Sequence, residues 1–309
     1  MLSRTASELY WMARYLERAE SLARVLDVTY KLSMMPSHSQ QQHDLALPLN
    51  LTMTHELFQQ RYAHFSMNNL LNFFALDNQN PSSIYNCIEM AWNNAHAVRG
   101  SLSSEVWECI NATRIDIRNL RHQGVDKIGI DAFFDWVKER SHLFRGAMFG
   151  TLLRNDAQCF IRLGTLIERA YATAQLLNVK HQQLTNDPDP VREYYRLDTL
   201  LRAVSAREAY HSIYRQPISS ETVTELLVLR EDVPRSLHAC VGDLVLQLEA
   251  IGSQRARVPH RLAHLLHVEL RFSTLDDILA QDLPTYLNHF IGKINELADS
   301  IRHTYLEAL

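Results

Sequence analysis

The sequence predicts an all-α fold, built as an internally duplicated helical bundle, and three observations lead to this prediction. Glycine and proline are scarce, at nine each in 309 residues, which favours long helices over tight turns. No segment alternates apolar and polar residues between turn signals, as a half-buried strand would. A helical motif also occurs twice: residues 15–19 read YLERA and residues 166–170 read LIERA, at an offset of 168 − 17 = 151.

The duplication extends beyond this motif. At the same offset Leu2 aligns with Leu153, and Leu26 aligns with Leu177. A second match, of residues 81–84 (PSSI) with residues 234–237 (PRSL), has an offset of 234 − 81 = 153. We therefore expect two helical repeats, residues 1–150 and 151–309, within one compact domain. We call the two helices that carry the repeated Glu-Arg pair the ER helices. They would lie at the centre of this domain, related by a pseudo-twofold axis.

The first helix is predicted over residues 5–33, because Thr5-x-x-Glu8 reads as a capping box at its start. Apolar residues then advance in steps of three and four along two neighbouring stripes, which indicates a helix buried on most sides. The stripes are Leu9, Met12, Leu16, Ala19, Ala23, Leu26 and Tyr30, and beside them Trp11, Tyr15, Leu22 and Val25.

The rest of the chain reads as helices joined by short breaks. Proline, serine and glutamine at residues 36–50 indicate a loop, Gly100-Ser101 indicates a break, and the DPDP run within His181–Pro190 indicates a linker. Helices are predicted over residues 52–76, 83–100, 103–121, 130–149, 151–179, 193–214, 219–229, 234–251, 258–270 and 284–307.

The two Glu-Arg pairs are the principal candidate site. Each Arg points about 100° away from the Glu that precedes it, so the two do not face each other. Under the pseudo-twofold axis, the natural pairing is reciprocal: Glu17 with Arg169, and Glu168 with Arg18. Arg14 lies on the helical face of Glu17, four residues from Tyr10.

Three interpretations of these pairs stay open. They could fix how two central helices cross, since buried ion pairs can specify register without adding stability. They could line a pocket in which two guanidinium forks hold a carboxylate or phosphate. A third possibility is a catalytic carboxylate, Glu17 or Glu168, acting as acid or base.

Composition excludes several other classes. A net charge of −4 gives no general attraction to nucleic acid or to an anionic membrane. No stretch approaches the roughly 20 apolar residues of a membrane span. The four cysteines, Cys87, Cys109, Cys159 and Cys240, match no zinc spacing and are expected to be reduced thiols of a cytoplasmic protein.

His260, His264 and His267 share one helical face, as metal ligands do. No acidic residue follows at a matching spacing, so we expect an exposed histidine stripe and no metal. The sequence also lacks a Gly-x-Ser-x-Gly elbow and a glycine-rich phosphate loop, so it does not predict a hydrolase or a nucleotide-binding enzyme.

Residues 2–6 (LSRTA), 9–11 (LYW), 14–20 (RYLERAE) and 26–30 (LDVTY) resemble the start of the bacterial alpha-E proteins, an all-helical family with an ER motif. The resemblance extends over nearly the whole chain. A second block is similar at Arg99, Leu102-Ser103, Glu105, Trp107-Glu108 and Asn111, and a third at Leu200-Leu201, Ser205-Ala206, Glu208-Ala209-Tyr210 and Tyr214-Arg215. Where the family often has RENAR, residues 92–96 read WNNAH.

The resemblance implies a partner. Members are typically encoded beside, or fused to, a circularly permuted ATP-grasp protein, often with peptide-handling enzymes. It therefore implies an accessory component of a peptide- or amide-ligase system, with ATP and Mg²⁺ on the partner and no cofactor on this chain. The alternatives are an independent enzyme that uses Glu17 or Glu168, and a scaffold that recruits partners. A homo-oligomer also stays open.

Overall fold

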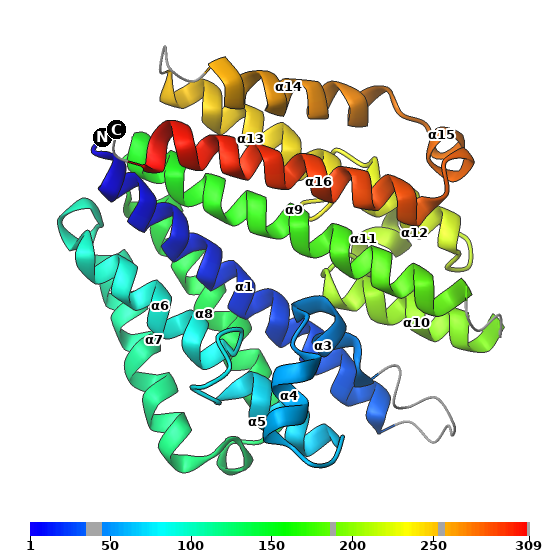
Figure 1. Cartoon of the computed structure of the whole chain (residues 1–309), viewed down its shortest axis with the longest axis horizontal. Coiled ribbons are helices and arrows are strands. Elements are labelled where there is room, and N and C mark those ends of the chain that lie inside the picture. The colour runs from blue at the N-terminus through cyan, green and yellow to red at the C-terminus, as the bar shows by residue number, and fades with distance from the viewer. Residues whose placement is uncertain (35–44, 186–189, 253–256, 308–309) are drawn as a thin grey trace. The chain divides into compact units, whose positions relative to one another are not determined.

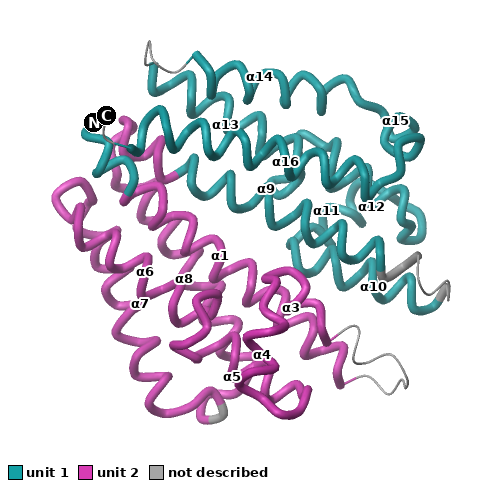
Figure 2. Tube along the Cα trace, viewed as in Figure 1, with its two compact units in different colours: residues 1–7, 162–309 teal, residues 8–161 magenta. Residues whose placement is uncertain are grey.

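The computed structural model of the chain describes residues 1–34, 45–185, 190–252 and 257–307, and these are helical with no strand (Figure 1). The all-α prediction is confirmed. The described residues group into two compact units (Figure 2). Unit 1 comprises residues 1–7 and 162–309, and unit 2 comprises residues 8–161.

Unit 2 contains most of the first ER helix and the helices that surround it. These are α1 (Ser3–Ser33), α3 (Leu47–Thr52), α4 (His55–Arg61), α5 (Met67–Ala75), α6 (Ile84–Ala97), the short 3₁₀ helices η1 (Arg99–Ser101) and η2 (Val125–Lys127), α7 (Ser104–Gln123) and α8 (Ile130–Thr151). Its core packs α1 residues such as Leu26 against Phe73 and Phe74 of α5 and Phe133 of α8. The buried stripe predicted for the first helix is confirmed, because Leu9, Met12 and Leu26 are wholly buried.

Unit 1 contains most of the second ER helix. Its elements are α9 (Asp156–Thr185), α10 (Pro190–Ala203), α11 (Arg207–Ile213), α12 (Ser220–Val228), α13 (Leu237–Ile251), α14 (Arg257–Phe272), α15 (Leu275–Ala280), α16 (Leu283–Ile301) and the π-helical turn η4 (Arg302–Leu306). α14 packs against both α13 and α16. Leu244, Leu266 and Ile294 are among the side chains buried there.

Serine side chains fix several helix starts. Ser83 accepts a hydrogen bond from the backbone N–H of Asn86 at 3.1 Å, and Ser236 accepts one from Ala239 at 3.0 Å. Each satisfies an amide that the first helical turn would otherwise leave without a partner. The predicted capping box at Thr5 is wrong, because α1 already begins at Ser3, with Ala6 N–H donating to the carbonyl of Leu2 at 3.0 Å.

Two predicted helices are in fact pairs of shorter ones. Residues 52–76 divide into α4 and α5, because Tyr62 is extended and Ser66 caps the second helix through Asn69 N–H. Residues 193–214 divide into α10 and α11 at Ser205, whose φ of 54° is left-handed. A non-glycine residue in that region interrupts helical geometry.

Other boundaries also differ from the prediction. The predicted linker His181–Pro190 is wrong for its first part, because α9 continues to Thr185; residues 186–189 lie outside the described residues. The sequence patterns missed α15, which begins with a capping box between Thr274 and Asp277. They also missed α3, which begins inside the predicted loop and ends at Thr52.

All four cysteines are buried free thiols, as expected. Burial raises the pKa of the Cys109 thiol, so the neutral form is favoured further. In the part of the chain that the structure describes, no helix is long and apolar enough to cross a membrane.

Candidate functional site: the ion cluster of α1 and α8

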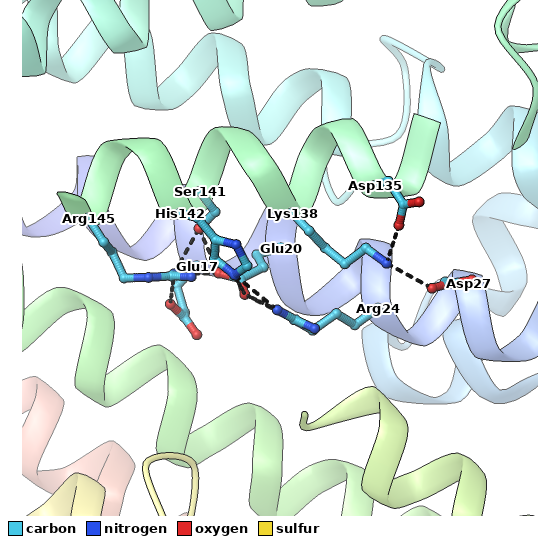
Figure 3. A network of polar contacts seen from close by, with 9 residues as sticks. All are labelled: Glu17, Glu20, Arg24, Asp27, Asp135, Lys138, Ser141, His142 and Arg145. Carbon is cyan, nitrogen blue, oxygen red and sulfur yellow. Dashed lines mark hydrogen bonds and ion pairs between the residues drawn. The ribbon is translucent and has the colours of Figure 1, made fainter. Parts of the chain in front are cut away.

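One face of α1 carries a row of charged side chains that meets α8 (Figure 3). Glu17, Glu20, Arg24 and Asp27 follow one another at steps of three, four and three, which places them along one side of the helix. Glu17 and Glu20 are almost wholly buried, at 2% and 0% exposure. Because buried carboxylates are costly unless they are paired, their partners decide what this face does.

Glu20 is the centre of the cluster (Figure 3). Its Oε1 accepts hydrogen bonds from Arg24 Nε at 2.9 Å and Arg24 Nη2 at 2.8 Å. Its Oε2 accepts one from Ser141 Oγ at 2.6 Å and another from Arg145 Nη1. One carboxylate therefore joins the ER helix to α8 with charge-assisted bonds on both oxygens.

Glu17 lies at the edge of the same cluster. Arg145 Nη1 is 3.5 Å from Glu17 Oε2, a longer contact than its bond to Glu20. Arg145 Nη1 also lies 2.9 Å from Ser141 Oγ. The guanidinium of Arg145 therefore contacts both glutamates, and its contact with Glu20 is the shorter of the two.

The row continues toward the end of α1. Lys138 Nζ lies 3.0 Å from Asp27 Oδ2 and 2.7 Å from Asp135 Oδ1, and Lys31 Nζ lies 2.6 Å from Asp27 Oδ1. Burial alone would lower the pKa of Lys138, but Asp135 and Asp27 outweigh it and the net pKa is raised. The hydrogen bond from Lys138 lowers the pKa of Asp135. This pairing favours the charged forms of Lys138 and Asp135.

The cluster is balanced in charge and has one side near solvent. The side chains of Arg24 and Arg145 are 12% and 22% exposed, and that of His142 is 58% exposed. His142 Nε2 lies 3.4 Å from Arg24 Nη2 and 4.0 Å from Glu20 Oε1. Chemically, the ion pairs hold α1 and α8 together. The partly exposed guanidinium groups of Arg24 and Arg145 are also of the kind that binds an anion.

The other arginines of the first ER segment lie on aromatic rings. The guanidinium of Arg14 is 4.9 Å from the ring centre of Trp11, and that of Arg18 is 5.6 Å from the ring centre of Tyr15. These are cation–π distances.

In the second ER segment, Glu168 is buried in α9, at 4% exposure, and Arg169 is partly buried. Pairs between Glu17 and Arg169, or between Glu168 and Arg18, would join the two units, and this pairing stays a prediction.

Three residues of the second family block come together on unit 2. Arg99 lies 4.9 Å from the ring centre of Trp107, whose ring is 5.9 Å from that of Trp92. Trp92 Nε1 donates to Asn111 Oδ1 at 3.0 Å, and His96 stacks on Trp92 at 4.7 Å. Trp92 and His96 belong to the WNNAH segment, so aromatic rings stand where the family often has charges. Glu105 is exposed in the first turn of α7, with no part in these contacts.

A charged triad extends this aromatic cluster. Arg114 lies 3.5 Å above the ring centre of Trp92 and donates to Glu89 Oε2 at 3.1 Å. Arg118 binds both oxygens of Glu89, at 2.5 and 2.8 Å. Desolvation would raise the pKa of Glu89, but the bonds from the two arginines outweigh it, and the net pKa is lowered.

The histidine stripe of α14 faces α13. His264 Nε2 lies 3.3 Å from Glu249 Oε1, and the ring of His267 lies 5.3 Å from that of His238. Desolvation lowers the pKa of His267, and His238 lowers it further. Within the described ranges, no group of three or more His, Cys, Asp or Glu side chains could hold a metal.

The sequence analysis missed Glu20, Ser141 and Arg145 as site residues. The spacing Glu20-x-x-x-Arg24 is a helical ion-pair signal and was available. The contribution of α8 could not be read from the sequence, because the bond between Arg145 and Glu20 spans 125 positions.

The comparisons with known proteins agree with the ER motif. Residues 1–306 match the model of the Alpha-E family, described as a predicted alpha-helical domain with a conserved ER motif. Uncharacterized proteins of Mycobacterium bovis and of two strains of Mycobacterium tuberculosis are each 22% identical, over 98% of this chain. The chain spans 37% of the length of each of these relatives. No solved structure matches. Because the family model covers nearly every residue, the chain belongs to the Alpha-E family.

Proposed function

We propose that this chain is the non-ATP-binding component of a peptide- or amide-ligase system that works with a circularly permuted ATP-grasp protein. Membership of the Alpha-E family supports the partner, and the mycobacterial relatives are long enough to contain further domains. In this proposal the complex assembles in the cytoplasm, and ATP and Mg²⁺ bind to the partner. The ER helices either bind a ligand or hold in place the surface to which the ATP-grasp protein binds.

One observation favours an anchoring role over catalysis. Glu20 accepts hydrogen bonds from Arg24, Ser141 and Arg145, so both of its oxygens are committed to fixed donors. A general acid or base must instead exchange a proton with a substrate within hydrogen-bond reach. The outer parts of Arg24 and Arg145 remain partly exposed, and guanidinium groups in that position suit a carboxylate or phosphate.

The direct test combines the two proteins. The chain and its ATP-grasp neighbour are co-purified, and amine-dependent ATP hydrolysis is measured for each alone and for the pair. We expect hydrolysis by the pair to exceed that of the ATP-grasp protein alone, and none from this chain by itself. Equal hydrolysis with and without this chain contradicts the proposal.

Arginine variants test the ligand role. Arg18→Lys and Arg169→Lys keep the charge but remove the planar fork, so the pair should lose activity while the helical content is unchanged. Arg61→Lys is the matched control, since Arg61 lies on the surface of unit 2 and pairs with Asp77 at 2.8 Å. If both variants keep full activity, Arg18 and Arg169 do not bind the ligand and their role is structural.

The enzyme alternative has its own discriminating variant. Glu17 is the ER motif's own carboxylate in this cluster, and it shares Arg145 with Glu20 at a distance of 3.5 Å. If the chain were an independent enzyme, Glu17→Gln or Glu168→Gln would abolish its turnover without weakening the complex. In our proposal neither variant removes a catalytic group, and the pair keeps measurable activity.

We further propose that the two ER helices arose by duplication and face each other across a pseudo-twofold axis. The repeated motif and the burial of both Glu17 and Glu168 support this pairing. A charge swap tests it. Glu17→Arg alone should destabilise the chain, and adding Arg169→Glu should restore part of the loss. Destabilisation that simply adds up in the double variant argues against the pair.

A further inference from the structure

The joint between α1 and α8 in unit 2 has a counterpart in unit 1, where α9 meets α16. The ER motifs of α1 and α9 place Glu17 and Glu168 at an offset of 168 − 17 = 151, and both glutamates are buried. α8 and α16 begin 283 − 130 = 153 positions apart, each after a residue with positive φ, Gly129 at 86° and Asp282 at 69°. If the units arose by duplication, as proposed above, each residue of the α1–α8 ion cluster has an equivalent in unit 1.

An uncharged pair joins the two helices in unit 1. The equivalents of Asp27 and Asp135 are Asn178 and Asn288, and Asn178 Nδ2 donates to Asn288 Oδ1 at 2.9 Å. In unit 2 the two aspartates are instead held by Lys138, at 3.0 and 2.7 Å. The same position therefore carries one amide hydrogen bond in unit 1 and a set of ion pairs in unit 2.

The pair at the centre of the cluster is also neutral in unit 1. Tyr171 and Gln175 occupy the positions of Glu20 and Arg24, and Gln175 Nε2 donates to Tyr171 Oη at 2.7 Å. The contact between residues four apart on the helix is kept, but its charges are not. Neither side chain of this pair can attract an ion as a carboxylate or a guanidinium does.

The helix on the other side of the joint differs in the same way. Ile294, which is wholly buried, and Ala298 are the equivalents of Ser141 and Arg145. Their side chains have no donor at the two positions through which α8 binds Glu20. Since neutral and apolar side chains suffice at these positions in unit 1, packing of the two helices does not by itself require the ions of unit 2.

Arg145 uses only part of its hydrogen-bonding capacity inside the cluster (Figure 3). All of its bonds run through Nη1, to Glu20 and Ser141 and, at 3.5 Å, to Glu17. None of the described residues accepts a hydrogen bond from Nε or Nη2. Neither nitrogen is among the buried atoms that lack a partner, so both reach solvent. Their N–H groups form one edge of the planar guanidinium, and this edge faces directly away from Nη1.

We propose that this edge of Arg145 binds a carboxylate group in bidentate fashion. Two parallel N–H groups match the two oxygens of a carboxylate. The bonds from Nη1 to Glu20 and Ser141 hold the guanidinium in place, so the edge is already oriented before the ligand binds and little side-chain freedom is lost on binding. The equivalent position in unit 1 is Ala298, so the site belongs to unit 2.

The charges of the cluster favour a carboxylate over a phosphate. Glu17 and Glu20 together offset Arg24 and Arg145, so the cluster has no excess positive charge with which to neutralise a dianion. A carboxylate brings one negative charge, whereas a phosphate monoester carries nearly two at neutral pH. The two buried glutamates therefore repel the phosphate about twice as strongly.

The nature of the substrate rests on the proposed function. In a peptide- or amide-ligase system the bound group is the carboxylate of a peptide or an amino acid, which Arg145 holds while ATP is bound by the partner. Binding of a carboxylate by the chain alone does not depend on that role, so the two can be tested separately.

Titration of the chain with sodium acetate tests carboxylate binding without the partner. The Nε–H groups of the arginines are followed by ¹H–¹⁵N NMR, with sodium chloride at equal ionic strength as the reference. We expect one Nε–H signal to shift to saturation with acetate, and that signal to be absent from the spectrum of Arg145→Lys. Inorganic phosphate should bind more weakly than acetate.

A lysine variant and a matched control locate the site, with the backbone amides of α8 as the readout. Arg145→Lys keeps a positive charge beside Glu20 but removes the two-pronged edge, so acetate binding should weaken by about tenfold or more. Arg140→Lys is the control, because Arg140 lies on the same helix, is 30% exposed and pairs with Asp116 at 3.4 Å. It should leave acetate binding unchanged.

A second variant copies the neutral joint of unit 1 into unit 2. It combines Glu20→Tyr, Arg24→Gln, Ser141→Ile and Arg145→Ala. Replacing a whole ion cluster by neutral side chains costs far less than removing one of its members. The variant should therefore keep its helical content and a cooperative thermal melt, both followed by circular dichroism, and should lose acetate binding.

Four results would overturn the proposal: no saturable shift beyond that caused by chloride, acetate binding that survives Arg145→Lys, phosphate that binds as tightly as acetate, or a copied joint that does not fold. N-acetylglycine, which adds a peptide group to the carboxylate, tests the substrate. Binding tighter than that of acetate supports a peptide substrate, and equal binding rejects that substrate while carboxylate binding by Arg145 stands.

Discussion

Glu20 and Arg145 lie 125 positions apart in sequence and are joined by a direct hydrogen bond from Arg145 Nη1 to Glu20 Oε2. The bond connects the face of α1 that follows the first ER motif to the last third of α8. Arg145 also reaches Glu17, at 3.5 Å, and Ser141, at 2.9 Å. Glu20, three residues beyond the motif's own glutamate, is therefore the residue that fixes the ER helix in unit 2.

Glu20→Ala should destabilise unit 2 more than Glu17→Ala. Glu20 accepts hydrogen bonds on both oxygens, from Arg24, Ser141 and Arg145, whereas Arg145 lies farther from Glu17, at 3.5 Å. Removal of a charged acceptor costs about 1.5–3 kcal/mol, and the remaining Arg24 and Arg145 reach solvent, which limits the loss. Urea unfolding followed by circular dichroism measures both variants. Equal losses, or a larger loss for Glu17→Ala, would show that the cluster is not centred on Glu20.

The triad of Glu89, Arg114 and Arg118 should make unit 2 sensitive to acid. The folded pKa of Glu89 is lowered from 4.5, so its contribution to stability is present above that value. It is lost as the pH falls from 4.5 through the folded pKa. Glu89→Gln should therefore be less stable than the native chain at pH 7, and the difference should shrink as the pH falls toward 3. Thermal melts across this range check the slope, and a gap that is independent of pH contradicts it.

His267 should also resist protonation, so its pH dependence has the same sign as that of Glu89 but lies in a higher pH range. Its folded pKa is lowered from 6.5 by desolvation, then by His238 and Arg271, while Glu231 acts in the other direction. Its contribution is full above pH 6.5 and falls as the pH drops from 6.5 through the folded pKa.

Proton NMR of the histidine ring measures this value. His238→Gln should raise the pKa of His267 toward 6.5, because it removes the imidazole whose electrostatic effect lowers that pKa. His303→Gln, on the exposed η4 turn, serves as the control and should leave it unchanged. An unshifted value in His238→Gln would mean that the two rings do not interact.

Arg114 and Trp92 should be coupled energetically. The guanidinium carbon lies 3.5 Å from the ring centre, well within the cation–π range, for which about 0.5–2 kcal/mol is typical. A double-mutant cycle with Arg114→Met and Trp92→Leu measures the coupling by urea unfolding. Because Arg114 also binds Glu89, the cycle is repeated in the Glu89→Gln background, where the aromatic contribution should persist. If the losses of unfolding free energy are additive in both backgrounds, Arg114 and Trp92 are not coupled.

The sequence predicted the fold class because helical periodicity and the scarcity of glycine and proline are local properties. The buried stripe of α1 follows from Leu9, Met12 and Leu26 alone, since residues at steps of three and four share a face in any helix. Helix ends were less certain. The extended Tyr62 and the left-handed Ser205 interrupt segments whose apolar periodicity continues unbroken, and one backbone residue leaves little trace in such a pattern.

The sequence by itself determined that the chain is helical, that its first helix carries a buried apolar stripe, and that the family is Alpha-E. These features depend on short spacings and on motifs that can be read residue by residue. Tertiary structure alone decided that Glu20 is the centre of the cluster and that α8 supplies Ser141 and Arg145. The physical reason is distance along the chain: the identity of a buried carboxylate's cation depends on which helices pack together, and helical periodicity carries no information about that choice.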